Sequence, residues 1–324
     1  MAKSGNQTVL GKAFEYACAS EIYDKYKEKN LIVFERSPQL ETAKRSFFNL
    51  SKEEQDRYIK GAQAAIKIID RFEPKLSNDD SNLYLSLQTD SKGISGDVRD
   101  IVCKKGTNWE IGISCKHNHH AVKHSRLSDR IDFGKEWFDI PCSTEYFDKI
   151  KKIFTPLRKM RDESKNSNPI LWSDLPNKEY DYYIPTLQIF SEELNRLNNA
   201  HKGEIPALLV RYLIGKNDFY KVIMNDSRRY TQIEAVNING TLNKSFGKIK
   251  ALIDVPLIKL PTKFYEIDFK DGSNNTLFVV CDEGWNISFR IHNASSKVEP
   301  SLKFDVTLLA MPSSILTQIE PWSK

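Results

Sequence analysis

Residues 96–116 combine a carboxylate and a lysine with a pattern that would hold the two together. Two apolar runs, 101–103 and 109–115, flank a short polar stretch, which predicts a β-hairpin. In the second strand alternate residues are apolar and share one face, so Lys116 stands at the strand end on the opposite face. If the first strand turns its apolar residues the same way, Asp100 shares the face of Lys116.

A carboxylate and a lysine on adjacent strands suit phosphodiester hydrolysis. Asp100 would bind a hard divalent cation such as Mg²⁺, which polarises a phosphate and lowers the pKa of an attacking water. Lys116 would orient that water or stabilise the developing charge. The alternative is an ordinary surface hairpin with one salt bridge, since both residue types are common.

Several sequence strings carry a specific resemblance. The pattern Asp…Ser-x-Lys across a hairpin looks like a variant of the PD-(D/E)xK nuclease site. The strings that resemble type II restriction endonucleases of the HaeIII family are Gly-Lys-Ala-Phe-Glu-Tyr-Ala (11–17), Ile-Ser-Cys-Lys-His-Asn-His-His (113–120), Lys-His-Ser-Arg-Leu-Ser (123–128) and Phe-Arg-Ile-His-Asn-Ala-Ser-Ser (289–296). The likeness runs from about Gly11 to Pro312. It implies a Mg²⁺-dependent endonuclease that cuts double-stranded DNA at GGCC.

The sequence departs from the usual nuclease motif two residues before the lysine, where Ser114 replaces an acidic residue. Glu110 shares the face of Lys116, but six residues of strand separate them by roughly 20 Å, so we expect a structural role for Glu110. Glu15 is the candidate that supplies the missing carboxylate, because it lies in line with an apolar helical stripe and a buried charge needs a partner. Nucleases that this chain resembles often use a glutamate of the N-terminal helix in this way.

The predicted catalytic residues are therefore Asp100, Lys116, Glu15 and Ser114, and the predicted metal ligands are Asp100 and Glu15. Asp97 is held as an alternative ligand or as a residue that supports the ligands, because its odd position puts it on the other face of the strand. The alternative for Glu15 is a salt bridge to a nearby lysine or arginine.

Four of the six histidines fall within residues 117–124, next to basic residues. We predict that this segment faces DNA and contacts phosphates through His117, His119, His120, Lys123 and Arg126. A zinc site lacks further ligands at a usual spacing, and the letters His-Asn-His alone are weak support for an HNH nuclease. A solvated polar helix start is the plain alternative.

A second group of candidate DNA contacts lies near the end of the chain. Arg290 and His292 alternate with apolar residues, so both lie on the polar face of a predicted strand, and Asn293 follows them. An arginine can donate two hydrogen bonds to guanine O6 and N7, and GGCC offers guanines on both strands. The alternatives for Arg290 are a phosphate contact or an ion pair with Asp305 across the sheet.

The elements that must position these residues alternate between helix and strand over the first two-thirds of the chain. Apolar periodicity and the Ser51–Glu54 capping box predict helices, at 12–26, 52–72, 145–162 and 186–198. Short apolar runs predict strands at 31–34, 83–87, 98–103 and 109–115. After about Lys216 alternation with period two predicts antiparallel strands with one polar face, among them 265–269, 285–291 and 302–308.

These elements predict an α/β protein with a restriction-endonuclease-like mixed sheet flanked by helices. Residues 1–215 would form the nuclease core, and residues 216–324 a β-rich region that reads DNA and could continue the core. A palindromic target favours a homodimer, and a monomer that cuts each strand in turn is the alternative. The rival function is a DNA-binding protein without catalysis on a nuclease-like fold.

Composition narrows the class of protein further. Of 324 residues 40% are hydrophobic, which suffices for a core and argues against wholesale disorder. Lys and Arg exceed Asp and Glu by 48 − 43 = 5, a mild excess that permits a polyanionic partner. Five cysteines without a C-x-x-C pair favour a reduced, cytoplasmic protein. No run could span a membrane, and no nucleotide-binding glycine loop is present, so we expect no nucleotide cofactor.

Overall fold

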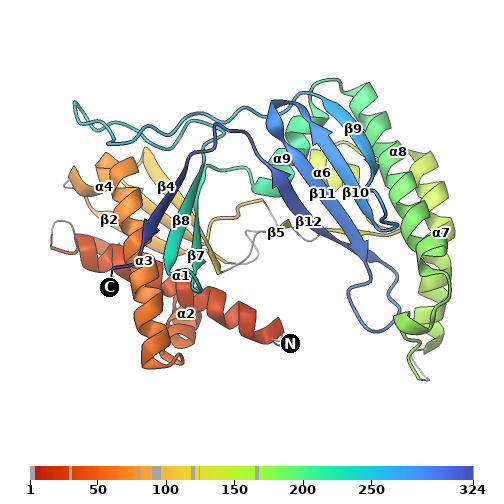
Figure 1. The fold of residues 1–324 in the computed structure, drawn as a ribbon, viewed down its shortest axis with the longest axis horizontal. Helices are drawn as coiled ribbons and strands as arrows, with labels where there is room; N and C mark the ends of the chain where they lie inside the picture. The colour runs from red at the N-terminus through yellow and green to blue at the C-terminus, as the bar shows by residue number, and fades with distance from the viewer. Residues whose placement is uncertain are drawn as a thin grey trace. The chain divides into compact units, whose positions relative to one another are not determined.

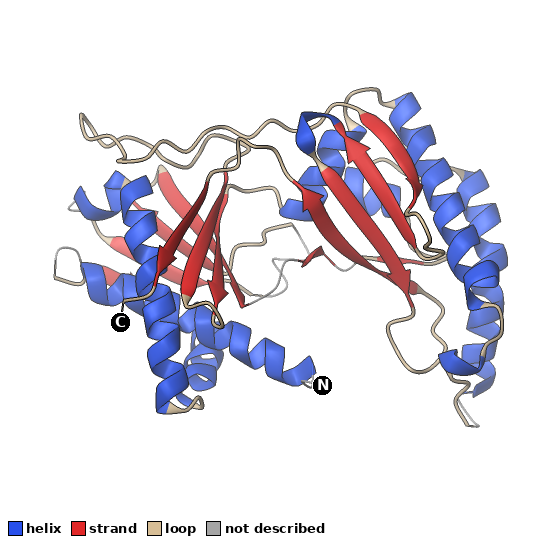
Figure 2. Ribbon diagram, in the orientation of Figure 1, coloured by secondary structure: helices blue, strands red, loops and turns tan. Residues whose placement is uncertain are grey.

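The chain forms two compact units in this computed structural model, which describes residues 4–28, 31–78, 81–89, 96–117, 121–123, 125–164 and 168–323. Unit 1 consists of Met1–His119, Gly215–Lys259 and Ser313–Lys324, and unit 2 consists of His120–Ile214 and Leu260–Pro312. Both units combine one sheet with helices (Figures 1 and 2). This arrangement confirms the predicted mixed α/β class.

The division differs from the continuous regions 1–215 and 216–324 predicted from the sequence. Three strands that follow residue 216 join the sheet of unit 1, and residues 120–214 belong to unit 2. The physical reason is pairing between segments far apart in the chain. One of these strands lies parallel beside the strand of Lys116, and the local sequence pattern does not predict such a pairing.

Unit 1 is built on a seven-stranded mixed sheet in the order β1-β2-β3-β4-β7-β8-β13. The strands are β1 (Ile32–Phe34), β2 (Leu83–Leu87), β3 (Ile101–Lys105), β4 (Trp109–His117), β7 (Phe219–Asn225), β8 (Tyr230–Val236) and β13 (Thr317–Pro321). The pairs β1–β2 and β4–β7 are parallel, and the other neighbours are antiparallel. The hairpin predicted between residues 101 and 115 is therefore the β3–β4 pair in the middle of this sheet.

The helices of unit 1 are α1 (Ser4–Tyr26), α2 (Pro38–Phe48), α3 (Lys52–Phe72) and α4 (Pro74–Asn78). The predicted capping box begins α3: Ser51 accepts from the Glu54 N–H, and Glu54 accepts from the Ser51 N–H. Helix α2 was not predicted from the sequence, although Ser37 and Pro38 are a good helix start. Its apolar positions are few, so its periodicity is weak.

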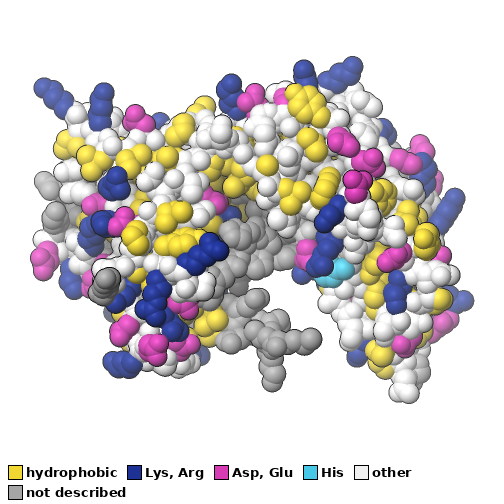
Figure 3. Space-filling view, in the orientation of Figure 1, with side chains coloured by type: hydrophobic (Ala, Val, Ile, Leu, Met, Phe, Trp, Pro, Cys, Tyr) yellow, Lys and Arg dark blue, Asp and Glu magenta, His cyan; other side chains and the backbone are white. Residues whose placement is uncertain are grey.

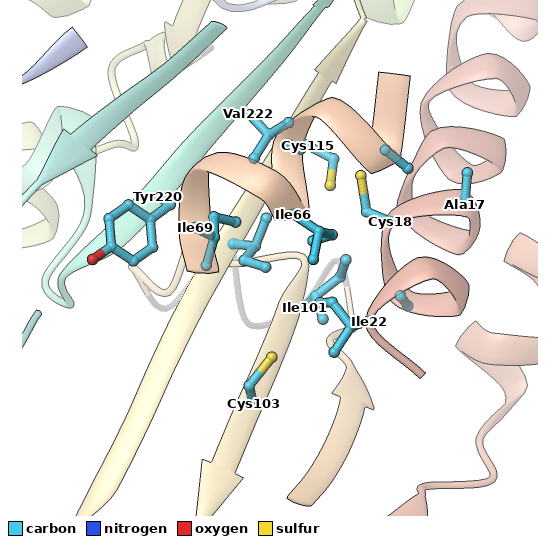
Figure 4. Close-up of a cluster of buried hydrophobic side chains, with 14 of the residues drawn as sticks. Ala17, Cys18, Ile22, Ile66, Ile69, Ile101, Cys103, Cys115, Tyr220 and Val222 are labelled. Atoms are coloured by element: carbon cyan, nitrogen blue, oxygen red, sulfur yellow. The ribbon is translucent and has the colours of Figure 1, made fainter. Parts of the chain in front are cut away.

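The core of unit 1 lies between the sheet and helices α1 and α3 (Figure 4). Cys18 and Ile22 of α1 and Ile66 of α3 face Cys115 of β4 and Ile101 of β3, and all five side chains are buried. This apolar layer fixes the rotation of α1 about its own axis. The side chains of the preceding, N-terminal turn of that helix therefore have a defined direction relative to the end of β4.

Unit 2 contains a six-stranded sheet in the order β5-β12-β11-β10-β9, with β6 also paired to β12. Its strands are β5 (Ala121–Lys123), β6 (Arg126–Leu127), β9 (Phe264–Phe269), β10 (Thr276–Cys281), β11 (Asn286–His292) and β12 (Leu302–Ala310). All pairs are antiparallel, as the alternation predicted. A turn at Asp271-Gly272 joins β9 to β10, and Gly272 has the positive φ of 69° that such a turn favours.

One face of this sheet is covered by helices. They are α6 (Phe133–Phe138), α7 (Thr144–Glu163), α8 (Ile184–Ala200) and α9 (Ile205–Ile214), with short helical turns at Trp172–Asp174, Glu179–Tyr183 and Asp282–Gly284. Phe289 of β11 and Phe304 of β12 pack against Phe190 of α8 and Trp137 of α6. The opposite face of the sheet carries the polar residues.

The structure bears on two expectations from composition, which concern the cysteines and membrane-spanning helices. All five cysteines are buried free thiols, as expected for a reduced protein. Within the described part of the chain, no helix is long and apolar enough to cross a membrane.

Candidate active site

The β3–β4 hairpin has the register that the apolar pattern predicted. Ile101 pairs with Ile113 and Cys103 with Ile111, so these four buried residues share one face of the hairpin. Asp100 directly precedes β3, and its N–H donates to the Ile113 carbonyl at 2.8 Å. Its backbone is thus tied to β4 before its side chain makes any contact.

The Asp100 carboxylate is held at the end of β4 by three groups. Its Oδ2 accepts from the Cys115 N–H at 2.7 Å and from Ser114 Oγ at 3.2 Å. The Lys116 ammonium lies 3.6 Å from the same oxygen. The structure therefore brings Asp100, Ser114 and Lys116 together, as predicted.

Lys116 combines a strong electrostatic partner with access to solvent. The negative charge of Asp100 raises the pKa of the Lys116 ammonium, so the group stays protonated at neutral pH. Its side chain is 33% exposed. The ammonium is thus a fixed positive charge that an anionic substrate could reach.

Glu15 of α1 is the third charged member of the group. The residue is only 6% exposed, and its Oε2 accepts from Lys12 Nζ at 3.1 Å. Burial, and after it the nearby charge of Asp100, raise its pKa to about 7, while Lys12 and Lys116 oppose the shift. The predicted burial of Glu15 is confirmed, and the salt bridge that was its alternative is present as well.

Glu15 and Asp100 form a pair of carboxylates whose mutual repulsion a cation would relieve. Both are hard oxygen donors, and Mg²⁺ is usually held by one or two carboxylates together with waters and substrate phosphates. Among the described residues no group of three His, Cys, Asp or Glu side chains could hold a metal ion by itself. The donor set therefore fits a cation that substrate phosphates help to bind.

The raised pKa of Glu15 gives a pH-dependent prediction for stability. A carboxyl with a folded-state pKa of about 7 instead of 4.5 binds its proton more tightly in the folded protein, so its contribution to stability falls as pH rises from 4.5 to 7. Without divalent metal, Glu15→Gln should therefore raise the free energy of unfolding at pH 8 by on the order of 1–3 kcal/mol. Urea unfolding at pH 5 and pH 8 measures this, and an equal effect at both pH values would contradict it.

Asp97, the alternative ligand, has a different partner. Its two oxygens accept from Arg99 Nε at 2.7 Å and from the other end of the guanidinium at 2.8 Å, and Arg99 lowers the pKa of the carboxyl. Arg99 also donates to Glu110 at 2.7 Å. A Cβ on Gly112 would lie 2.0 Å from Arg99 Cδ, so only glycine leaves room for this side chain. These contacts favour a supporting role for Asp97 and a structural one for Glu110.

A second charged pair on the same face of the sheet was not predicted from the sequence. Lys221 of β7 is the register partner of Ser114, and its Nζ lies 3.2 Å from Glu234 Oε2 of β8. Both side chains are about nine-tenths buried. The lysine inside the apolar run Phe-Tyr-Lys-Val-Ile-Met was the available signal, because buried lysines need partners.

The predicted phosphate contacts lie partly outside the described residues. His119 and His120 are not described, and His117 ends β4 with an undescribed side chain. Lys123 pairs through its backbone with Val306 of β12. Arg126 lies on β6 of unit 2 and donates to Glu299 at 2.7 Å.

The second group of DNA candidates lies on β11. Arg290 donates to Asp305 Oδ2 at 2.7 Å, which is the ion pair foreseen as one of its alternatives. His292 Nε2 lies 3.2 Å from the same oxygen, and His292 Nδ1 lies 2.9 Å from the Asn293 carbonyl. The Asn293 amide donates to the Lys297 carbonyl and so closes the following loop.

Comparison with known proteins gives evidence of the protein's family that is independent of this geometry. The model of the HaeIII restriction endonuclease family matches residues 11–312. The chain is 41% identical over 315 residues to the type II restriction enzyme HaeIII of Haemophilus aegyptius, which covers 97% of this chain and 98% of that enzyme. No solved structure matches the chain. With Asp100, Lys116 and Glu15 inside the matched segment, the chain belongs to the HaeIII restriction endonuclease family, a family of site-specific DNA endonucleases.

Proposed function

We propose that this restriction endonuclease hydrolyses phosphodiester bonds of double-stranded DNA at GGCC with Mg²⁺ as its cofactor. The observation that carries the proposal is the convergence of Glu15, Asp100 and Lys116, from one helix and two strands, within a chain of this family. The hairpin and the proposed metal-ligating residues support a PD-(D/E)xK-like core. In this core Glu15 takes the place of the missing strand carboxylate.

The carboxylates of Asp100 and Glu15 are the proposed ligands of the cation. A bound Mg²⁺ would polarise the scissile phosphate and lower the pKa of the attacking water. Asp100 keeps its orientation through the Cys115 N–H and the Ser114 hydroxyl, and Lys12 balances part of the charge on Glu15. Ser114 thus acts by holding Asp100.

Lys116 acts on the reacting phosphate. Its ammonium is fixed beside Asp100 and stays charged, so it can orient the nucleophilic water and stabilise the negative charge that develops on the phosphoryl oxygens. This stabilisation is greater in the transition state than in the bound substrate, which is the condition for accelerating the chemical step.

Contacts to DNA divide into two kinds in this proposal. His117, His119, His120, Lys123 and Arg126 are proposed to contact phosphates, because they follow Lys116 in the chain. Arg290 is proposed to read guanine, with His292 and Asn293 beside it. Arg290 is 58% exposed on β11 between the buried Phe289 and Ile291, which fix the direction of its side chain.

The two kinds of contact predict different losses of affinity. Arg290→Ala should cost about 1–3 kcal/mol of binding to GGCC and relax discrimination at one position. Lys123→Ala should weaken binding to all sequences about equally and lower the dependence on salt. Binding to GGCC and to its single-base variants at two salt concentrations measures both, and a uniform loss for Arg290→Ala would assign that residue to the backbone.

A palindromic target also makes a homodimer the proposed DNA-bound state, because its two-fold symmetry matches that of the site. Sedimentation of the protein with a GGCC duplex tests this. Two chains per duplex are expected, whereas one chain per duplex would mean that the two strands are cut in turn.

The experiment that tests the proposed function is digestion of a plasmid followed by sequencing of the fragment ends. Discrete ends at GGCC are expected when the purified protein is supplied with Mg²⁺. Ends at another sequence would refute the proposed target, and intact plasmid would favour a protein that binds DNA without cutting it.

A further inference from the structure

The open face of the unit 2 sheet presents a donor and an acceptor side by side. Arg290 of β11 and Asp305 of β12 are register partners, and Arg290 donates to Asp305 Oδ2 at 2.7 Å. The apolar faces of the two strands pack on the helices, so both charged side chains point away from them. Figure 3 shows basic, acidic and histidine side chains gathered on this part of the surface.

The pair has little value as a stabilising contact. The Arg290 side chain is 58% exposed and that of Asp305 26% exposed, and ion pairs between solvent-exposed groups contribute little to stability. A pair of this kind holds a flexible arginine in one direction. It also presents an acceptor next to that arginine.

The chemistry of this arrangement matches a G·C base pair. In the major groove guanine offers the acceptors O6 and N7, to which arginine donates, and cytosine offers its N4 amino group, which an aspartate accepts. A carboxylate has about four lone-pair sites on two oxygens, so Asp305 can accept from Arg290 and from a base at once. The two side chains together therefore complement the two halves of one base pair.

We infer that Asp305 is a specificity-determining residue that accepts a hydrogen bond from cytosine N4 in the base pair whose guanine Arg290 reads. This inference rests on the proposed function, since it names how the GGCC site is recognised. It adds a reader of the cytosine in that base pair, to which no other residue has been assigned. Asp305 also keeps His292 beside the pair, 3.2 Å from Oδ2.

Base analogues test the inference without relying on cleavage. Duplexes in which each cytosine of GGCC in turn is replaced by 2-pyrimidinone lack one N4 amino group, and their affinity is measured by fluorescence anisotropy in EDTA. For the wild-type protein, one cytosine position should lose roughly 10- to 100-fold in affinity. Asp305→Ala should show a similar loss on normal GGCC and should respond less than about 2-fold to the analogue at that position.

A matched control removes another ion pair of the same unit. Glu299 binds Arg126 at 2.7 Å with a side chain 23% exposed, close to the 26% of Asp305. Glu299→Ala should respond to 2-pyrimidinone as the wild type does. Thermal unfolding of both variants checks that they are folded, and the wild-type response to the analogues depends on no variant.

Two outcomes would overturn the inference. If the wild-type protein is indifferent to loss of N4 at both cytosines, Asp305 does not read cytosine and serves only to position Arg290. If Asp305→Ala keeps the full response to the analogue, another residue reads that amino group. Failure of the proposed function is distinct from both, because the protein would then show no preference for GGCC over other duplexes.

Discussion

Replacing Lys116 by alanine should lower the rate of DNA cleavage by at least ~10³-fold while specific binding stays close to that of the wild type. The ammonium is one of the few charges fixed at the end of β4, 3.6 Å from Asp100 Oδ2. Its effect falls on charge that develops only in the transition state, so its loss lowers kcat rather than affinity. Single-turnover cleavage and gel-shift binding of a GGCC duplex measure the two quantities.

Lys104→Ala is the matched control for this prediction. Lys104 lies on the same hairpin, at the far end of β3, where its Nζ lies 3.2 Å from Glu110 Oε2. It should cleave DNA nearly as fast as the wild type. If Lys116→Ala loses affinity for all DNA sequences and little else, Lys116 grips phosphate and takes no part in the chemical step.

Removing Glu15 should have an effect of similar size through loss of the cation. Glu15→Ala leaves Asp100 as the remaining carboxylate of the pair, so cleavage at low Mg²⁺ should fall by at least ~10³-fold, and high Mg²⁺ should restore part of it. The pKa of Glu15 is raised to about 7, and only the ionised carboxyl holds the cation. The rate of wild-type cleavage should therefore increase as the pH rises toward that value. Cleavage rates over a range of Mg²⁺ concentrations measure this.

Glu110→Ala is the comparison for Glu15→Ala. Glu110 binds Arg99 and Lys104, and neither lies among the partners of Asp100. Its removal should therefore keep most of the activity at all Mg²⁺ concentrations. The opposite ranking, with Glu110→Ala inactive and Glu15→Ala active, would mean that the second carboxylate comes from β4.

The central part of the site could be predicted because it depends on local rules. The period of two in β3 and β4 fixes which side chains share a face, so Asp100 and Lys116 were expected together. The period of the first helix likewise put Glu15 in line with the buried Cys18 and Ile22. These patterns act over a few residues and need no knowledge of distant partners.

Other features depend on pairing between segments far apart in the chain, which local patterns do not contain. The parallel β4–β7 contact places Lys221 beside Ser114, about a hundred residues earlier in the chain, and so assigns β7 and β8 to the sheet of the active site. Alternation showed that Arg290 lies on a polar face. Asp305 was one of several possible partners for Arg290, and the register of β11 and β12 selects it.

Asp97 illustrates how local packing changes the assignment of a charged residue. On sequence alone it was either an alternative ligand beside Asp100 or a residue that supports the ligands. The space above Gly112 admits the Arg99 side chain, which then takes both oxygens of Asp97. A steric detail of one glycine thus separates a supporting carboxylate from the proposed ligands.

The most direct test of the account is whether cleavage depends on a divalent cation while binding does not. We expect that EDTA abolishes cleavage of a GGCC plasmid, that added Mg²⁺ restores it, and that specific binding of a GGCC duplex persists in EDTA. Asp100→Asn should stay inactive at every Mg²⁺ concentration, because it removes the charge that Glu15 and Lys116 both face. Cleavage that continues in EDTA, or an Asp100→Asn variant that cuts normally, would contradict the proposed site.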